Sequence, residues 1–296
     1  MYAVMGITGK VGGALASTLL ESGAGVRAVV RDAAKARAWT NRGSWTNGGC
    51  EIAQATAEDA TALTRAFQDV EGVFVMLPPV FDPQPGFPEA KAAIAAISQA
   101  LRAAAPARIV CLSTIGADAR QPNLLNQLGL LEEALQSLPT PITCLRPCWF
   151  MDNAAFDIAS ARATGHIDSF LQPLDKPYPM VAARDVGSLA AQLMQETWNG
   201  HRIIELEGSR HLTPNDIAES FSAALRAPVV ARAIPHRDWE SLFRAQGMQN
   251  PTPRMQMLEG FNAGWIRFSD DDSQRRKGRT TIDQVMAGLV GQRSTS

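Results

Sequence analysis

Three glycines near the N-terminus carry the clearest chemical signal in the chain. Gly6, Gly9 and Gly12 follow a short apolar run at residues 2–5 and open a segment with an apolar stripe at helical spacing. Between a strand and a helix, such glycines permit a tight turn, let the backbone approach a pyrophosphate and let the helix pack against the sheet. The free N–H groups of the helix would then face the phosphates. The spacing therefore predicts a dinucleotide-binding turn.

The residue that ends the second predicted strand indicates which dinucleotide binds. Arg31 follows the largely β-branched run at 26–30 and precedes Asp32. An acidic side chain at this place accepts the ribose 2′-hydroxyl of NAD, whereas an arginine suits the 2′-phosphate of NADP. Lys10, inside the turn, would add a second positive charge; the alternative is that Lys10 and Arg31 are solvated surface charges. We expect NADP(H), with NAD(H) as the alternative cofactor.

The elements that position this turn alternate along the chain. After residue 32, strand patterns lie at 50–53, 73–77, 107–112, 142–145 and 202–206, and helical patterns at 33–39, 58–67, 88–104, 124–138 and 184–197. This alternation predicts an α/β fold with a doubly wound, Rossmann-type parallel sheet. We expect an NAD(P)-binding domain at 1–150, to which 184–207 return, and a smaller discontinuous C-terminal α/β lobe for substrate or partner at 151–183 and 208–296. The charged stretch 270–279 is expected to be a solvated loop.

Ligands of open parallel sheets bind at the carboxyl ends of the strands. There, Pro78 and Pro79 end one predicted strand, and the proline-rich loop 80–88 is expected to cap the cofactor cleft. Ser113 and Thr114 follow the next strand. Their hydroxyls suit a nicotinamide ribose or a substrate carbonyl, or else cap the following turn.

Composition excludes several classes of protein. The chain has 296 residues and a net charge of −1, which gives no electrostatic footprint for nucleic acid or a membrane surface. No apolar run approaches the ~20 residues that span a bilayer, and the N-terminus does not resemble a secretory signal. We therefore expect a cytoplasmic protein. The near-duplication of 39–43 at 45–49 is expected to form a surface loop.

The cysteines and histidines do not form a metal-binding pattern. The four cysteines are scattered and mostly in apolar surroundings, so we expect buried free thiols. The histidines His166, His201, His211 and His236 are isolated from one another. No metal ligands are predicted.

Several segments together resemble the NmrA-like branch of the atypical short-chain dehydrogenase/reductases. They are GITGKVG at 6–12, VRAVVRD at 26–32, ITCLRPCWFMDN at 142–153, ARDV at 183–186 and ELEG at 205–208. The resemblance implies a cofactor domain, a small discontinuous C-terminal lobe, and NADP(H) or NAD(H) in the cleft between them. The branch holds reductases, including quinone oxidoreductase-like members, and redox sensors that bind the dinucleotide and regulate a partner.

The motifs and the resemblance together assign the binding residues. The predicted cofactor contacts are Gly6, Ile7, Thr8, Gly9, Lys10, Val11, Gly12, Arg31, Leu77, Pro78, Ser113 and Pro147, and the predicted substrate contacts are Thr114, Phe150 and Asn153. Relatives usually carry Gly-Asp where this chain has Ala55-Thr56-Ala57, which removes an acidic residue near the adenine.

The chain lacks the Tyr-x-x-x-Lys pair with which short-chain dehydrogenases transfer a proton. The positions of that pair, counted back from Glu132, are occupied by Leu124 and Leu128. No catalytic residue is therefore predicted, and reduction of a ketone to an alcohol, which needs a proton donor, is not expected. An isoflavone reductase-like activity would require a lysine after the fifth strand, but none occurs between Lys91 and Lys176.

Two hypotheses remain for the function. In the first, the protein reduces a quinone-like or other conjugated small-molecule acceptor by direct hydride transfer, which needs positioning rather than a side-chain acid. The aromatic residues Trp149, Phe150, Phe156 and Phe170 would suit a flat apolar acceptor. In the second, the protein is a non-catalytic redox sensor that acts through a regulated partner protein.

Overall fold

The computed structural model describes residues 1–40 and 49–291, and most of the near-duplicated segment lies outside these residues. Its largest feature is an eight-stranded sheet with the strand order β13-β10-β6-β5-β4-β1-β2-β3. Every neighbouring pair is parallel. The strands are β1 Tyr2–Met5, β2 Val26–Val30, β3 Cys50–Gln54, β4 Gly72–Val75, β5 Arg108–Leu112, β6 Ile142–Pro147, β10 His201–Glu207 and β13 Arg275–Lys277. The predicted Rossmann-type sheet is confirmed.

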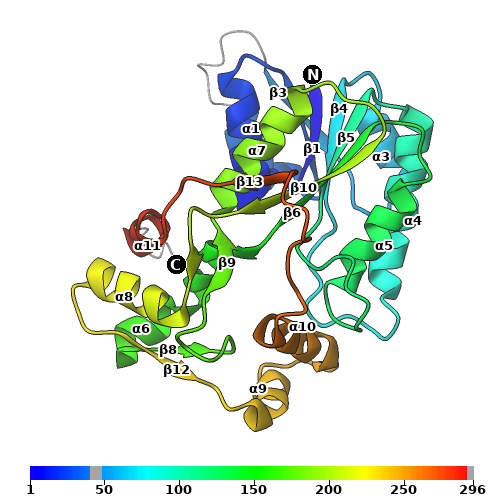
Figure 1. Cartoon of the computed structure of the whole chain (residues 1–296). Coiled ribbons are helices and arrows are strands. Elements are labelled where there is room, and N and C mark those ends of the chain that lie inside the picture. The colour runs from blue at the N-terminus through cyan, green and yellow to red at the C-terminus, as the bar shows by residue number, and fades with distance from the viewer. Residues whose placement is uncertain (41–48, 292–296) are drawn as a thin grey trace.

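Helices cover both faces of this sheet (Figure 1). Helices α1 (Lys10–Glu21) and α7 (Ala183–Gln195) pack together on one face, and α3 (Ala60–Phe67), α4 (Pro88–Ala104) and α5 (Asn126–Leu135) lie on the other. One hydrophobic core lies beneath each layer. Because the central strands are buried on both faces, they are continuously apolar in sequence. After β2 come the short helices η1 (Ala33–Ala36) and α2 (Arg37–Thr40).

The smaller lobe lies beyond the carboxyl ends of the central strands (Figure 1). It contains a three-stranded sheet of order β11-β9-β7 and a two-stranded pair β12-β8. Its elements are β7 Trp149–Phe150, η2 Met151–Asp157, α6 Ile158–Thr164, β8 His166–Ser169, β9 Tyr178–Val181, β11 His211–Leu212, α8 Pro214–Leu225, β12 Val230–Ala233, η3 His236–Asp238, α9 Trp239–Ala245, α10 Thr252–Ala263 and α11 Ile282–Gly291.

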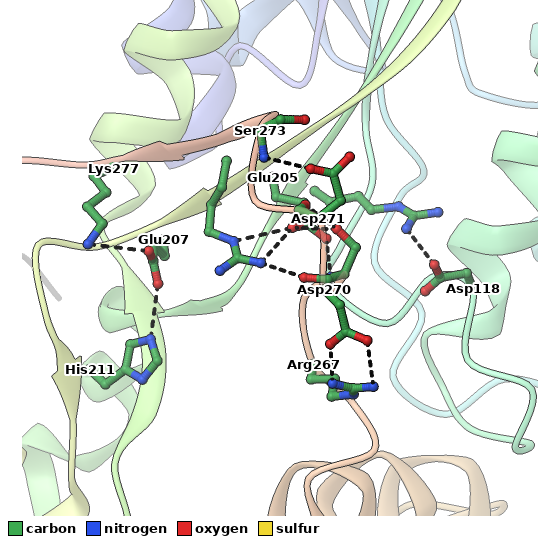
Figure 2. A network of polar contacts seen from close by, with 12 residues as sticks. Asp118, Glu205, Glu207, His211, Arg267, Asp270, Asp271, Ser273 and Lys277 are labelled. Atoms are coloured by element: carbon green, nitrogen blue, oxygen red, sulfur yellow. Dashed lines mark hydrogen bonds and ion pairs between the residues drawn. The ribbon is translucent and has the colours of Figure 1, made fainter.

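The expectation of a solvated loop at 270–279 holds for 270–274, which are exposed, but residues 275–277 form β13, which pairs in parallel with β10. Two buried carboxylates on β10 explain this difference. Glu205 accepts a hydrogen bond from the Ser269 N–H at 2.8 Å and pairs with Arg275 at 3.4 Å. Glu207 pairs with Lys277 at 3.6 Å (Figure 2). The Glu205 and Glu207 carboxylates hold β13 at the edge of the sheet. Part of 208–296, which was assigned to the smaller lobe, therefore belongs to the large sheet.

The start of the helix predicted at 124–138 also differs from the expectation. Asn126 Oδ1 accepts from the Asn123 N–H at 2.7 Å, and Asn123 Oδ1 accepts from the Leu125 N–H at 2.8 Å. Such local side-chain bonds offer the backbone an alternative to the helix. Helix α5 therefore begins at Asn126, and Leu124 precedes it.

Other expectations concern the thiols, metal binding and the membrane. The four cysteines are free and buried, as predicted. Within residues 1–40 and 49–291, no group of three or more His, Cys, Asp or Glu side chains is arranged to hold a metal ion. Over the same residues, no helix combines the length and apolarity that crossing a bilayer requires.

Candidate functional site

The glycine turn joins β1 to α1 through close backbone contacts. Gly6 has a φ of +72°, which favours glycine, and its carbonyl accepts from the Gly9 N–H at 2.9 Å. A Cβ on Gly12 would lie 2.5 Å from the Gly6 carbonyl carbon and closer still to its oxygen. Gly9 stands at the N-cap of α1 and supplies no side-chain cap. The first-turn N–H groups of α1 therefore have no side-chain cap, and N–H groups of this kind can bind a phosphate.

Arg31 lies just beyond the end of β2, with an exposed side chain. Its neighbour Asp32 turns away, because the carboxylate accepts from the Ala34 N–H at 2.9 Å and caps η1. In the part of the chain that the structure describes, the Arg31 guanidinium makes no hydrogen bond or ion pair. The positive group at this strand end thus has no partner among the described residues, whereas one oxygen of the acidic group is engaged in the cap of η1.

Lys10 connects the turn to the smaller lobe. Its ammonium lies 3.3 Å from the Asp152 carboxylate, and Asp152 also accepts from the Ala183 N–H at 2.7 Å at the start of α7. Lys10 is half exposed, whereas Asp152 is mostly buried. The charge that the sequence assigned to phosphate binding is therefore shared with a carboxylate on η2.

The remaining predicted contacts are distributed over the turn and the strand ends. Ile7, Val11, Leu77 and Pro147 are buried, Thr8 is exposed, and Pro78, Thr114, Phe150 and Asn153 are half-buried. The half-buried residues keep some surface for a ligand at the carboxyl edge of the sheet. The buried ones shape the backbone of that edge.

Ser113 takes part in a charged network that the sequence analysis missed. Its buried hydroxyl donates to Glu132, which pairs with Arg146 in a two-bonded arrangement at 2.9 and 2.6 Å. Arg146 also donates to Asp118 at 2.8 Å. Arg146 is 5% and Glu132 6% exposed. A glutamate and an arginine within otherwise apolar segments were the sequence signal for this pair.

This network keeps Arg146 charged inside the protein. Burial opposes the charge, but the hydrogen bonds and negative charges of Glu132 and Asp118 outweigh it and raise the pKa of the Arg146 guanidinium. Because the Ser113 hydroxyl is engaged with Glu132, the neighbouring hydroxyl that keeps some exposure is that of Thr114, which is half-buried.

The positions expected for the tyrosine and lysine hold apolar side chains in the structure as well. Leu124 is buried and its N–H donates to the Pro253 carbonyl at 2.9 Å, so the start of α10 covers it. The chain's two tyrosines lie elsewhere. Tyr2 is in β1, and the Tyr178 hydroxyl donates at 2.8 Å to the Gln172 carbonyl. Burial raises the pKa of Tyr178 to about 12, which makes it a poor proton donor.

The loop at 80–88 is tied to the smaller lobe. The Asp82 carboxylate accepts from the Gln249 and Asn250 N–H groups, both at 2.7 Å, and the Asn250 amide donates to the Pro83 carbonyl at 2.8 Å. We call these four residues the Asp82 clasp. The clasp joins the segment after β4 to the segment before α10, on either side of the carboxyl edge.

Three of the four aromatic residues singled out in the sequence lie inside the lobe. Trp149 meets Phe261 edge to face with ring centroids 5.3 Å apart, and Phe170 stacks on Phe243 at 4.8 Å. Phe150 is half-buried beside Trp149. Phe156, by contrast, is 83% exposed on η2 and does not belong to this aromatic cluster.

Two further cavities lie away from the glycine turn. One of ≈ 690 Å³ lies over β6 and β10 and is lined by Glu132, Arg146 and Glu205, among others. Another of ≈ 670 Å³ is lined by residues that include Tyr178, Glu207 and Arg275. Glu132, Glu205 and Glu207 in these cavities are paired with cations. Among the described residues, Asp271 of the first cavity and Asp272 of the second form no ion pair. Neither cavity is lined by a residue of the glycine turn.

Asp157, at the end of η2, makes the free energy of unfolding depend on pH. Burial, helped by the negative charge of Asp168, raises the pKa of Asp157 from 3.8 to about 6. Since the folded protein favours the neutral acid, this stabilisation is complete below pH 3.8 and is lost as the pH rises through 6. Asp157→Asn should therefore raise the free energy of unfolding at pH 8 by about 1–3 kcal/mol and change it little near pH 4.

Urea unfolding of the wild type and Asp157→Asn across pH 4–8 measures this effect. Asp175→Asn makes the same chemical change at an exposed position and should show no such trend. A difference between Asp157→Asn and the wild type that does not change with pH would contradict the assignment.

The sheet topology and the glycine turn define the class of Rossmann-type proteins with a dinucleotide-binding turn. A profile of the NmrA-like family matches residues 2–264, so the chain belongs to that family. It is 28% identical over 250 residues to an NAD(P)H azoreductase of Xenophilus azovorans, an alignment that covers 84% of this chain and 82% of the relative.

Two solved structures share the fold over almost the whole chain. One is an NADPH-dependent quinone oxidoreductase of Escherichia coli in complex with NADPH, with a TM-score of 0.77 and 21% identity, covering 98% of this chain and 99% of the other. The second is a triphenylmethane reductase of Citrobacter sp. complexed with NADP(H), with a TM-score of 0.77 and 18% identity, covering 97% and 99%. At these identities the likeness concerns the fold.

Proposed function

We propose that the protein is an NADP(H)-dependent oxidoreductase that transfers a hydride to a quinone-like or other conjugated acceptor. The observation that carries this proposal is an intact dinucleotide turn combined with leucines, Leu124 and Leu128, at the places of the usual proton-donating pair. Such a site favours acceptors that need positioning and a solvent proton rather than a side-chain acid. The names of the azoreductase and the quinone oxidoreductase support the same class of reaction.

The residues present fit the cofactor. The free first-turn N–H groups of α1 would hold the pyrophosphate, and Arg31 would hold the 2′-phosphate. When bound, NADPH would supply a hydride, and a proton from water would complete the reduction of the acceptor. Thr114 and Asn153 would orient the acceptor through hydrogen bonds, and Phe150 would pack against its ring.

The alternative function is a non-catalytic redox sensor that acts through a partner protein. The contact between Lys10 and Asp152 favours it, because Asp152 also binds the start of α7. A dinucleotide phosphate that draws Lys10 away would change the surroundings of both η2 and α7. Cofactor occupancy would then be transmitted to the smaller lobe.

Replacing Arg31 with alanine tests the choice of cofactor. Losing a charge-assisted contact to the 2′-phosphate should weaken NADPH binding by about 1–3 kcal/mol, or roughly 5- to 150-fold, and leave NADH binding nearly unchanged. Titration of nucleotide fluorescence measures both affinities. Lys35→Ala removes a nearby exposed charge as a control. Equal losses for NADPH and NADH would refute the role of Arg31.

Whether the protein oxidises NADPH in the presence of an acceptor distinguishes the reductase from the redox sensor. NADPH binding is measured first, and a panel of quinones is then added while the absorbance of the reduced nicotinamide is followed. Oxidation above the uncatalysed rate supports the reductase. Tight binding without oxidation by any acceptor favours the sensor, and failure to bind either nucleotide contradicts both.

A further inference from the structure

Arg254, in the first turn of α10, is a half-buried cation with no carboxylate partner in residues 1–40 and 49–291. Its Nη1 lies 3.7 Å from the Met248 sulfur, and its guanidinium carbon lies 4.6 Å from the centre of the Phe243 ring. Arg146 and Arg202, which are also withdrawn from water, each pair with a glutamate. Arg254 therefore differs from them, because its one hydrogen bond to a described residue goes to the weak acceptor sulfur of Met248 and its other N–H donors are available.

The place of Arg254 relates it to the proposed acceptor site. The preceding residue, Pro253, accepts from the N–H of Leu124, the position expected for the family's proton donor. Phe243, beneath the guanidinium, stacks on Phe170. The same apolar cluster reaches Trp149, just after the carboxyl end of β6. Arg254 thus follows the Asp82 clasp closely in the chain, and its guanidinium packs on the aromatic cluster of the lobe.

A guanidinium in these surroundings is well suited to an anion. It has five N–H donors in a planar fork that matches two oxygens of a carboxylate or sulfonate. Burial lowers the pKa of the Arg254 guanidinium, so an anion that enters relieves the cost of desolvating the charge. Contact with the Phe243 ring orients the group without satisfying its donors.

We propose that Arg254 binds an anionic substituent of the acceptor, so that the preferred substrates are conjugated ring compounds bearing a carboxylate or sulfonate. This inference rests on the proposed function and narrows its substrate class. The aromatic cluster would contact the ring system, and Arg254 would fix the end that carries the charge. Arg254 is thus assigned to acceptor specificity and takes no part in hydride transfer.

The test compares two quinones in the presence of NADPH: 1,4-naphthoquinone and its 2-sulfonate. Arg254→Met keeps the length of the side chain and its packing on Phe243 but removes the charge. It should lower kcat/KM for the sulfonate by about 10- to 100-fold, mainly through KM, and change the neutral quinone less than about threefold. Arg254→Lys, which keeps the charge, should recover part of the loss for the sulfonate. Arg237→Met removes a charge at an exposed site, 84% by side chain, as the control.

Equal losses for the two quinones, or no loss for the sulfonate, would overturn the proposal. If the wild type oxidises NADPH with neither quinone, the proposed reductase function fails, and calorimetric titration of the NADPH-bound protein with naphthalene-2-sulfonate tests the anion site by itself. Affinity that falls about tenfold in Arg254→Met supports the site. Equal affinity in the two proteins rejects it.

Discussion

Gly12→Ala is expected to abolish measurable NADPH binding and to lower the free energy of unfolding by at least about 2 kcal/mol. The added Cβ would lie 2.5 Å from the Gly6 carbonyl carbon, inside the turn that the phosphates must approach. Helix α1 cannot shift to make room, because Gly187 of α7 already lies against its backbone: a Cβ there would be 2.7 Å from the Leu15 nitrogen. The conflict must therefore distort the turn itself.

Nucleotide titration and urea unfolding together measure the effect of Gly12→Ala. Gly288→Ala is the matched control, since Gly288 also lies within a helix but has no atom within 4 Å of an added Cβ. The control should bind NADPH normally and gain up to about 1 kcal/mol from helix propensity. Normal NADPH affinity in Gly12→Ala would show that the turn is not the phosphate site.

Glu132→Gln is expected to lower the free energy of unfolding by about 3–5 kcal/mol. The change leaves the Arg146 charge inside the protein with only the exposed Asp118 as a partner, and it weakens the bond from Ser113. The cost comes mainly from the uncompensated charge, because breaking a buried pair is far more costly than replacing both members.

Unfolding midpoints of three variants measure this cost. Glu133→Gln makes the same change at the adjacent exposed position and should alter stability by less than about 0.5 kcal/mol. The double variant Glu132→Leu with Arg146→Met should recover much of the loss, because neither charge remains buried. If Glu132→Gln is as stable as Glu133→Gln, the pair contributes nothing to the fold.

Local chemistry explains which elements were predictable from the sequence. Helix α4 was expected at 88–104 and has those bounds, because Pro88 starts it and the chain leaves helical geometry at Ala105, which has a φ of +46°. The glycine turn and Arg31 were likewise identified from neighbouring residues. Their assignment to cofactor binding stays a prediction that the variants above test.

The features that the sequence analysis did not predict depend on contacts between residues that are distant in the sequence. Ser113 was expected to face the cofactor or the following turn. Its hydroxyl instead donates a hydrogen bond to Glu132, 19 residues away. Within the charged segment, residues 275–277 form β13 beside Glu205 and Glu207. The Asp185 carboxylate accepts a hydrogen bond from the Thr280 N–H at 2.8 Å and so anchors the residues after the strand. Neither outcome follows from local composition, since a charged run is usually solvated.

The late position of β13 has a consequence for how the protein is made. During synthesis β10 leaves the ribosome well before Arg275 and Lys277, so the nascent chain carries Glu205 and Glu207 without these cations and with an unpaired strand edge. Open edges of this kind invite pairing with other chains. We therefore expect chains that stop before residue 275 to aggregate, even though every predicted cofactor contact is already present in them.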